Sequence, residues 1–413
     1  MSSKLQIVKG MRDLSGVEAK SFAHLEDTAR QIFGLYGFEE LRTPILEFTE
    51  LFTKGIGQDT DIVGKEMYLV LDRREKSLAL RPEGTASVVR HVASQGLMRQ
   101  KKQVKFFYFG PMFRYERPQK GRFRQFYQIG VESFGNAGPD GDLELFLMLR
   151  QYFSAIGLKN VGFQLNSIGC PAPDCRPAFR AKLVGFLSAQ KEALCPDCQR
   201  RLETNPLRVL DCKNERCIQL TQDAPKSIDS LCGSCKGHHQ ELLGLLEAHQ
   251  ISYETNNRLV RGLDYYSKTV FEVYSADLGA QSAAGGGGRF DGLFEQFGEE
   301  PVPSVGFALG LDRLVMLCPE PPKGQAPVFV IGWEQKAVSL MVAQLREAGI
   351  GAEYDPGRAS MKSQFKQADR FGGRWTLVLG EEEIRTGQVT LKNMQQGTQT
   401  TLSPNEALKL IRA

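Results

Sequence analysis

The alternation of apolar and polar residues predicts a series of helices and strands along the chain. Apolar residues recur at helical spacing between Glu18 and Tyr36, and Gly37 ends this pattern. A second helix is expected over about 142–156, up to Gly157, and a strand is expected over 161–166. The apolar stripe of the first helix consists of Phe22, Leu25, Ala29, Ile32, Phe33 and Tyr36.

Between these helices, residues 107–132 are predicted to form two strands joined by a basic loop. Side chains alternate between the two faces of a strand, so a strand over 125–133 places Phe126, Gln128, Gly130 and Glu132 on one face. A preceding strand that runs through Arg114 would bring that guanidinium beside them. The loop adds Arg117, Lys120, Arg122 and Arg124. Guanidinium groups beside an aromatic ring suit a nucleoside triphosphate; a hairpin with a solvated, basic tip is the alternative.

The second half of the chain changes character twice. From about 171 to 248 it is rich in Cys, Pro and charged residues, which indicates an insertion into the preceding domain. Residues 283–292 are expected to form a glycine-rich turn, where either the backbone approaches a small ligand or the turn is simply flexible. After a predicted linker at 321–327, a strand over 328–332, a helix over 335–348 and a strand over 375–379 predict a small α/β domain.

Composition narrows the class of protein. A chain of 413 residues, 41% hydrophobic and 24% charged, is long enough for roughly two to three globular domains. It has no apolar run of the ~20 residues that a membrane span needs, and its N-terminal residues lack the apolar stretch of a signal peptide, so we expect a cytoplasmic protein. A net charge of +4 does not by itself indicate nucleic-acid binding.

Cysteines fall into close pairs, and without an export signal they are expected to be reduced thiols or metal ligands. Two pairs have the C-x-x-C spacing with which two thiolates bind one zinc ion. A zinc knuckle is therefore predicted from Cys195, Cys198, Cys232 and Cys235. Candidates for a second site are Cys170, Cys175, Cys212 and Cys217. Buried cysteines that act as small hydrophobic residues are the alternative.

A basic stripe is predicted near the C-terminus, where Arg358, Lys362, Lys366 and Arg370 recur every four residues. Like charges at this spacing destabilise a helix by a few tenths of a kcal/mol per pair, so helix stability does not explain them. A helix face that contacts the phosphate backbone of RNA would explain them. A solvated helix face is the alternative.

Five segments in order along the chain resemble a known family. Residues 113–117 and 121–126 resemble motif 2 of class II aminoacyl-tRNA synthetases, residues 306–313 resemble motif 3, and Thr43-Pro44 resembles motif 1. Two further segments, 80–85 and 259–266, resemble those of histidyl-tRNA synthetases. The resemblance implies ATP-dependent activation of L-histidine as histidyl-adenylate, followed by transfer to the 3′ end of tRNA(His). Mg²⁺ would share the phosphate charge, whereas this chemistry needs no zinc.

The resemblance also implies roles for the basic residues. It assigns Arg114 to the α-phosphate, Arg122 to the γ-phosphate, and Phe126 with Arg313 to the two faces of adenine. Arg261 corresponds to a catalytic arginine that bridges the substrate carboxylate and the α-phosphate. Cations and positioning suit this reaction, because its barrier is largely charge repulsion. In the motif 2 loop, Arg117 and Gln119 are candidates for contact with the tRNA acceptor stem.

Histidine recognition requires groups that bind an ammonium and an imidazole. Glu83, Thr85 and Gln128 match the family's positions for the α-ammonium. Imidazole can donate from nitrogen, so the desolvated carboxylate of Glu132 is a logical partner, beside Tyr265 and Tyr266. Two alternatives remain: the Glu83 carboxylate caps a helix, and the paired tyrosines are ordinary core residues.

The expected fold is therefore α+β, with a class II catalytic domain built on an antiparallel sheet. It would occupy residues 1–170 and 249–320, with the Cys-rich insertion at 171–248 and a mixed-sheet α/β anticodon-binding domain at 328–413. The resemblance of motif 1 also implies a homodimer. The alternative function is a catalytically silent subunit that senses histidine. Such paralogues typically lack the C-terminal domain and alter the arginine that Arg261 represents here.

Overall fold

The chain divides into two compact units, Met1–Pro321 and Pro322–Ala413. The computed structural model describes residues 5–58, 60–279, 283–320, 327–357 and 359–412. Apart from Pro327, the predicted linker at 321–327 lies outside these residues. Each unit has its own sheet and its own hydrophobic core. Among the described helices, none combines the length and the apolar character needed to cross a membrane.

The first unit is built on an eight-stranded sheet with the order β1-β5-β6-β11-β10-β9-β7-β8. All neighbouring strands are antiparallel except β1 with β5 and β7 with β8. The predicted antiparallel sheet is thus confirmed. Its strands are β1 (Glu39–Glu40), β5 (Val104–Phe113), β6 (Gln125–Phe134), β7 (Gly162–Ser167), β8 (Glu254–Thr255), β9 (Ser267–Tyr274), β10 (Ala283–Arg289) and β11 (Ser304–Gly310).

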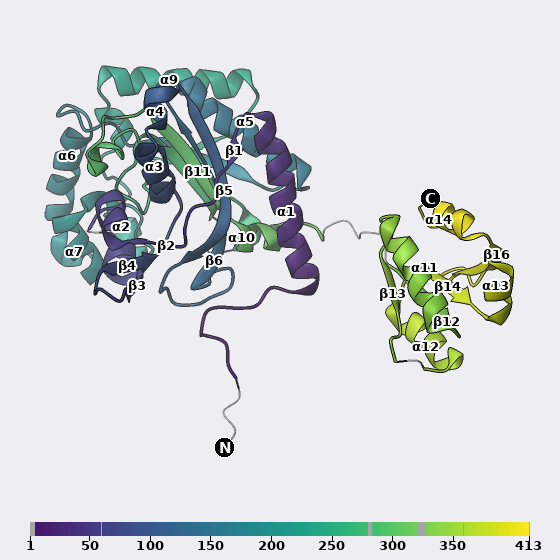
Figure 1. Ribbon diagram of the computed structural model, residues 1–413. Coiled ribbons are helices and arrows are strands. Elements are labelled where there is room, and N and C mark those ends of the chain that lie inside the picture. Colours follow the sequence, from purple (N-terminus) through teal and green to yellow (C-terminus); the bar gives the residue numbers. More distant parts are fainter. Residues whose placement is uncertain (1–4, 59, 280–282, 321–326, 358, 413) are drawn as a thin grey trace. The chain divides into compact units, whose positions relative to one another are not determined.

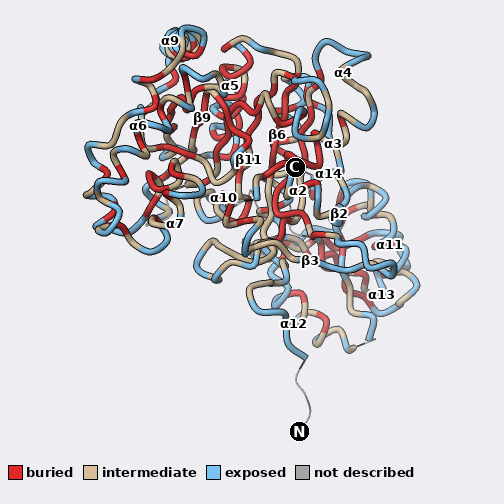
Figure 2. Tube along the Cα trace, turned by 90° about the vertical axis from the view of Figure 1, so that its left-hand side faces the viewer, coloured by how far each residue is buried: buried red, intermediate tan, exposed pale blue. Residues whose placement is uncertain are grey.

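Helices pack on both faces of this sheet (Figure 1). One core joins the sheet to α1 (Gly16–Leu35), α5 (Pro139–Ala155), α9 (Gly233–Ala248) and α10 (Leu311–Leu317). The other joins it to α3 (Thr85–Ser94), α6 (Arg176–Ser188) and α7 (Pro196–Thr204). Figure 2 shows buried residues following β6, β9 and β11. The helices predicted over 18–36 and about 142–156 are confirmed as α1 and α5.

The Cys-rich segment is helical and contributes to the two cores that flank the eight-stranded sheet. It contains α6, α7, α8 (Glu215–Leu220) and α9. Leu183 and Leu202 join the core on one side of the sheet, and Leu242 and Leu246 join the core on the other. The segment therefore stabilises the same sheet that carries the first-unit pocket described below.

A small sheet in the first unit leaves apolar side chains exposed. Its order is β2-β4-β3, with β2 (Leu46–Phe48), β3 (Tyr68–Leu71) and β4 (Ser77–Leu80), and it lies beside α2 (Thr49–Ile56). α4 (Leu97–Gln100) follows α3. The exposed apolar residues of this sheet are Leu46, Phe48, Leu69, Val70 and Leu71.

The second unit is a five-stranded mixed sheet with the order β13-β12-β14-β15-β16. β12 is parallel to β13 and β14, whereas β15 is antiparallel to β14 and β16. The predicted mixed sheet is confirmed. The elements are β12 (Val328–Gly332), α11 (Gln335–Glu347), β13 (Ala352–Tyr354), α12 (Met361–Phe371), β14 (Trp375–Leu379), α13 (Glu381–Thr386), β15 (Val389–Asn393), β16 (Gln399–Leu402) and α14 (Pro404–Arg412).

Candidate functional site

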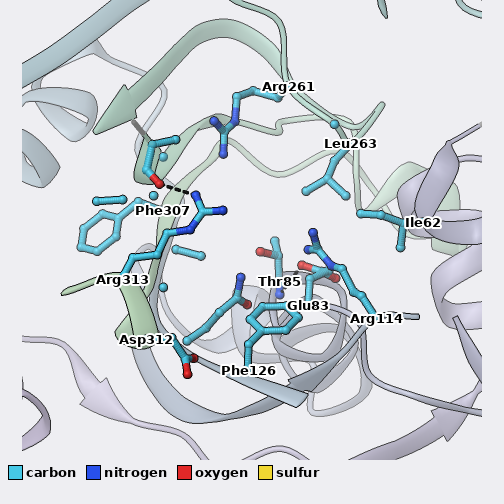
Figure 3. Close-up of a pocket in the computed structure, with 18 of the residues that line it drawn as sticks. Ile62, Glu83, Thr85, Arg114, Phe126, Arg261, Leu263, Phe307, Asp312 and Arg313 are labelled. Carbon is cyan, nitrogen blue, oxygen red and sulfur yellow. Dashed lines mark hydrogen bonds between the residues drawn. The ribbon is translucent and has the colours of Figure 1, made fainter. Parts of the chain in front are cut away.

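A cavity of about 260 Å³ in the first unit gathers most of the predicted site residues. They come from segments far apart in the sequence, because β6, β10 and β11 are neighbours in the sheet. Figure 3 shows the guanidinium groups of Arg114, Arg261 and Arg313 reaching this cavity from different sides. The predicted residues that line it are Glu83, Thr85, Arg114, Arg122, Phe126, Gln128, Glu132, Arg261, Tyr265, Tyr266 and Arg313.

The strand β6 supplies one face of the cavity, as its alternation predicts. Phe126, Gln128 and Glu132 all line the cavity. Glu132 pairs in register with Gly306 of β11. A Cβ atom on Gly306 would lie 1.9 Å from Glu132 Oε2, so the glycine leaves the space that this carboxylate occupies.

The Glu132 carboxylate is buried but only half satisfied. Its Oε1 accepts a hydrogen bond of 2.6 Å from Thr85 Oγ1 and a long one of 3.5 Å from the Tyr108 hydroxyl. Its Oε2 has no hydrogen-bond partner among the described residues. Burial, reinforced by the nearby Glu83 charge, raises the pKa of Glu132 well above its usual range. A ligand N–H group placed at Oε2 would satisfy the carboxylate.

Glu83 has a structural role in addition to its place in the cavity. Its carboxylate accepts hydrogen bonds from the backbone nitrogens of Thr85, at 2.7 Å, and Ala86, at 2.9 Å. These bonds satisfy amides at the start of α3, so the helix-capping alternative describes a real contact. Burial raises the pKa of Glu83 despite them. Nearby, Gln128 Oε1 is buried and has no hydrogen-bond partner within the described ranges, which leaves an acceptor for a cationic ligand group.

The cavity arginines are held by different contacts. Arg114 donates from Nε to Pro82 O at 2.9 Å, and its guanidinium carbon lies 5.3 Å from the centroid of the Phe126 ring. Arg122 forms an ion pair of 2.8 Å with Glu116. Arg313 donates to the backbone carbonyl of Ala283. Burial, followed by the charge of Arg122, lowers the pKa of Arg313. These cations lie close enough to repel one another, and an anionic ligand would relieve that repulsion.

Arg261, like Glu132, uses only part of its hydrogen-bonding capacity within the protein. Its Nη1 pairs with Glu272 Oε2 at 3.0 Å, whereas its buried Nε has no hydrogen-bond partner among the described residues. Its guanidinium lies against β10, where a Cβ atom on Gly286 would come within 2.7 Å of Nη1. A glycine at this position therefore leaves room for the arginine.

The prediction of a glycine-rich turn at 283–292 is wrong for most of its length. Residues Ala283–Arg289 form β10, paired on both sides within the sheet. The glycines suit a strand here because their backbone is closely approached: a Cβ atom on Gly287 would lie 2.0 Å from Gly306 O. Ala283, Ala284, Gly285 and Gly286 line the cavity, so the backbone does approach the ligand site.

Tyr265 and Tyr266 are both core residues and cavity residues. Their ring centroids lie 4.7 Å apart, and both side chains are buried in the core that also contains Tyr108. Tyr108 was not predicted as a site residue. It fills space left by Gly84 and Gly130, where a Cβ atom would lie about 2 Å from its ring. The glycine at position 130, on a strand otherwise rich in large residues, was the available signal.

The sequence interpretation also missed the contacts of Asp312. Its Oδ2 accepts from the backbone nitrogen of Tyr127 at 2.8 Å, and its Oδ1 pairs with Arg12 Nη2 at 2.8 Å. The carboxylate thereby ties α10 and the N-terminal segment to β6. In Figure 3 it points away from the centre of the cavity. Asp312 therefore positions β6 and is poorly placed to contact a ligand.

The remaining predicted nucleic-acid contacts lie outside the cavity. Arg117 and Gln119 are exposed in the loop between β5 and β6, where Gln119 and Arg122 exchange backbone hydrogen bonds of 3.1 and 2.9 Å. In the second unit, Lys362, Lys366 and Arg370 are exposed on α12. Arg358 lies outside the described residues.

The predicted zinc knuckle is wrong in its pairing of cysteines. The described structure brings Cys195 and Cys198 together with Cys212 and Cys217, not with Cys232 and Cys235. The last two meet Cys170 and Cys175 instead. The path of the chain explains this pairing. Cys232 and Cys235 lie at the start of α9, and there the chain comes back to the segment that follows β7, which carries Cys170 and Cys175. All nine cysteines are free thiols.

Both units match known families and structures along almost their whole length. A family model described as histidyl-tRNA synthetase matches residues 10–171 and 208–314, and one described as anticodon binding domain matches residues 325–413. Histidine–tRNA ligases from Oleidesulfovibrio alaskensis and Maridesulfovibrio salexigens are 48% and 47% identical to the chain; the alignments cover 98% of this chain and 98% and 100% of those proteins. The crystal structure of apo histidyl-tRNA synthetase from S. aureus matches with a TM-score of 0.81 at 30% identity, covering 99% of this chain and 100% of that one.

Proposed function

The chain belongs to the histidyl-tRNA synthetase family and is a histidine–tRNA ligase, and we propose that the first-unit cavity is where it activates histidine. One observation carries this proposal: the cavity is lined by cations, an aromatic ring and buried carboxylates, and three of its buried polar atoms lack hydrogen-bond partners among the described residues. These atoms are Glu132 Oε2, Gln128 Oε1 and Arg261 Nε. They match an imidazole N–H, an ammonium and a carboxylate, respectively.

Activation joins the histidine carboxylate to the α-phosphorus of ATP and releases diphosphate. Both reactants are anionic, so cations placed around them lower the barrier. We assign Arg261 to the carboxylate and the α-phosphate, Arg114 to the α-phosphate and Arg122 to the γ-phosphate. Each already lines the cavity. Arg122 would exchange its ion pair with Glu116 for the phosphate.

Magnesium accompanies ATP in this family, and the residues present fit the ion. Glu116 lines the cavity, and Glu272 pairs with Arg261, so both place carboxylate oxygens near the proposed phosphate position. Carboxylates and phosphate oxygens are the ligands that Mg²⁺ prefers. When bound, the ion shares the phosphate charge. This chemistry needs no zinc.

Histidine itself would be recognised at the other end of the cavity. Glu132 accepts a hydrogen bond from the imidazole, with Thr85 holding the opposite carboxylate oxygen at 2.6 Å. Gln128 and Glu83 face the α-ammonium, and Tyr265 and Tyr266 form the wall. Adenine would then lie between Phe126 and Arg313, both of which line the cavity.

Transfer of histidine requires tRNA, and both units offer exposed basic residues for it. Arg117 and Gln119, in the loop beside the cavity residue Arg122, suit the acceptor end; Gln119 carries both a donor and an acceptor for a base edge. In the anticodon-binding domain, Lys362, Lys366 and Arg370 share one face of α12. We assign this face to the phosphate backbone on the anticodon side.

The proposal extends to a homodimer that works in the cytoplasm, where tRNA is charged for translation. Five exposed apolar residues lie on the small sheet next to the motif 1 segment: Leu46, Phe48, Leu69, Val70 and Leu71. The register of the sheet places Leu46, Phe48 and Val70 on one face and Leu69 and Leu71 on the other. Exposed apolar side chains grouped on one face favour burial against another protein surface. A second copy of the chain is the partner that the family suggests.

Histidine-dependent exchange of pyrophosphate into ATP tests the first step. We expect exchange with histidine alone among the amino acids, reduced about 100- to 1,000-fold by Arg261→Ala. Arg99→Ala is the matched control, because the Arg99 side chain is 81% exposed. Replacing Lys362, Lys366 and Arg370 by alanine should lower aminoacylation of tRNA(His) while leaving exchange intact. Binding of histidine without any exchange would instead support the regulatory-subunit alternative.

A further inference from the structure

We propose that the chain binds two zinc ions, one in each of two four-cysteine clusters outside the cavity. The first cluster consists of Cys170, Cys175, Cys232 and Cys235. The second consists of Cys195, Cys198, Cys212 and Cys217. Four thiolates around one position are the ligand set of a structural zinc site, which needs no open coordination position.

The spacing of the sulfur atoms fits a single ion in each cluster. All four sulfurs of a cluster lie within 4.8 Å of one another. Cys170 Sγ lies 3.8 Å from Cys232 Sγ, and Cys195 Sγ lies 3.9 Å from Cys212 Sγ. A tetrahedral ion with Zn–S bonds of about 2.3 Å holds its sulfurs about 3.8 Å apart. The clusters therefore already have the size of an occupied zinc site.

Backbone amides and helix starts are arranged to favour thiolates. Cys195 precedes the first residue of α7 and Cys232 precedes that of α9, so each C-x-x-C pair lies at a helix N-terminus. Cys175 occupies the same position before α6. The backbone nitrogen of Cys195 donates to Cys217 Sγ at 3.2 Å.

The first cluster shows the same pattern of amide donors. The backbone nitrogens of Cys170 and Cys232 donate to Cys175 Sγ at 3.3 and 3.4 Å. Amide donors of this kind stabilise metal-bound sulfur and fix its orientation.

Positive charge lies beside each cluster. Arg176 interacts electrostatically with Cys170, Cys175 and Cys235, and Arg201 interacts with Cys198. Four thiolates around one Zn²⁺ carry a net charge of about −2, which these guanidinium groups partly offset. Cysteines that served only as small hydrophobic residues would not need cations or converging amide donors around their sulfurs.

The positions of the clusters show what the ions would hold together. The first cluster joins the segment after β7 to the start of α9, which closes the stretch from Cys170 to Cys235 at its two ends. The second joins the start of α7 to the turn around α8. Zinc would thus add to the stabilisation that this segment already gains from its buried leucines. The family model does not match residues 172–207, which carry Cys175, Cys195 and Cys198.

The closed stretch in turn supports residues 258–266, which include the segment at 259–266 that resembles histidyl-tRNA synthetases. Arg176 donates from Nη1 to Tyr266 O at 2.6 Å, and Asn205 donates to Asp264 at 2.6 Å. Arg258 donates to the carbonyls of Thr221, at 2.8 Å, and Leu210, at 3.1 Å. The ions would therefore lie outside the reaction but would stabilise the backbone that presents Arg261 and the two tyrosines.

Metal analysis of the full chain, purified without chelators, tests the proposal. Elemental mass spectrometry should give a molar ratio of two zinc ions per chain. Cys198→Ser and Cys235→Ser should each lower that number to one. Cys318→Ser is the matched control and should leave two, because Cys318 belongs to neither cluster. Fewer than two zinc ions in the unaltered chain, or iron in their place, would overturn the assignment.

X-ray absorption at the zinc edge keeps the test decisive if the serine variants do not fold. It uses the unaltered protein and distinguishes the clusters from zinc bound at the surface. We expect a first shell of four sulfur atoms at about 2.3 Å. A shell of nitrogen or oxygen ligands would contradict the proposal even if zinc were present in the expected amount.

Discussion

The cavity and the cysteine clusters both gather side chains from distant parts of the chain, but the groups that they offer differ. In the cavity, the buried atoms without hydrogen-bond partners in the described part of the chain are a carboxylate oxygen, an amide oxygen and a guanidinium nitrogen. In each cluster, the four possible ligand atoms are all sulfur. Varied donors and acceptors suit an organic molecule with several functional groups, whereas a repeated soft ligand suits one ion.

The two regions also differ in what they require of the surrounding fold. The cavity depends on register, since Glu132 fits only because Gly306 lies opposite it, and Arg261 only because Gly286 lies beneath it. The clusters depend on the path of the chain, since each brings cysteines at the N-terminus of a helix together with cysteines from a distant segment. Arg176 connects the regions, because it lies beside the first cluster and donates to Tyr266 O in the wall of the cavity.

The largest expected effect comes from removing the carboxylate that would accept a hydrogen bond from imidazole. Glu132→Gln should lower kcat/KM for histidine in pyrophosphate exchange by about 100-fold, because bound imidazole favours the ionised carboxylate and a hydrogen bond to a charged acceptor contributes about 1.5–3 kcal/mol. The change should appear mainly in KM for histidine, while KM for ATP stays close to that of the unaltered enzyme. Glu241→Gln, on the exposed side of α9, is the matched control. An unchanged KM for histidine would show that Glu132 does not bind the imidazole.

The difference between the regions also explains which parts were predictable from the sequence. The face of β6 was predictable because strand alternation is local, so the positions of Phe126, Gln128 and Glu132 follow from neighbouring residues. The grouping of the arginines followed from resemblance, since Arg114, Arg261 and Arg313 belong to separate segments. The pairing of cysteines was not predictable from spacing, because C-x-x-C identifies two ligands and leaves the other two to the path of the chain.

Two further misses share one physical cause. The glycines of β10 were assigned to a turn because glycine usually marks turns, yet here they allow strands and Arg261 to approach closely. Tyr108 was missed because its space is provided by Gly84 and Gly130, one of which lies outside its hairpin. In both cases the missing information is a contact between segments that are distant in sequence.

A smaller effect is expected where the two regions meet. Arg176→Ala should raise KM for histidine about 10-fold with little change in KM for ATP, because the lost hydrogen bond supports Tyr266 and not the phosphate site. Arg176→Lys should restore part of the affinity, since an ammonium can also donate to the carbonyl. Arg180→Ala is the control, because Arg180 is exposed on α6. An equal rise in KM for histidine and in KM for ATP would indicate general unfolding. It would mean that Arg176 does not link the first cluster to histidine binding.

The smallest effect is a pH dependence of stability that belongs to the cavity alone. The pKa of Glu132 is raised by burial, so the folded chain holds a proton at pH values where the unfolded chain has released it. The stability from this proton is present below the unfolded pKa of about 4.5 and is lost as pH rises toward the folded value. Glu132→Gln cannot ionise, so its Tm should exceed that of the unaltered chain by about 1–2 °C near pH 8, the shift that ~1 kcal/mol produces in a unit of this size.

Thermal unfolding of both proteins from pH 5 to pH 8 measures this difference. The gap in Tm should widen steadily with pH, because only the unaltered chain must bury a carboxylate that prefers to ionise. Glu241→Gln should show a gap that does not change with pH, since its side chain is exposed in the folded chain. A gap that narrows as pH rises would mean that the folded chain stabilises the ionised carboxylate. Glu132 would then be an acceptor already prepared for imidazole, and the unpaired Oε2 would carry no energetic cost before histidine binds.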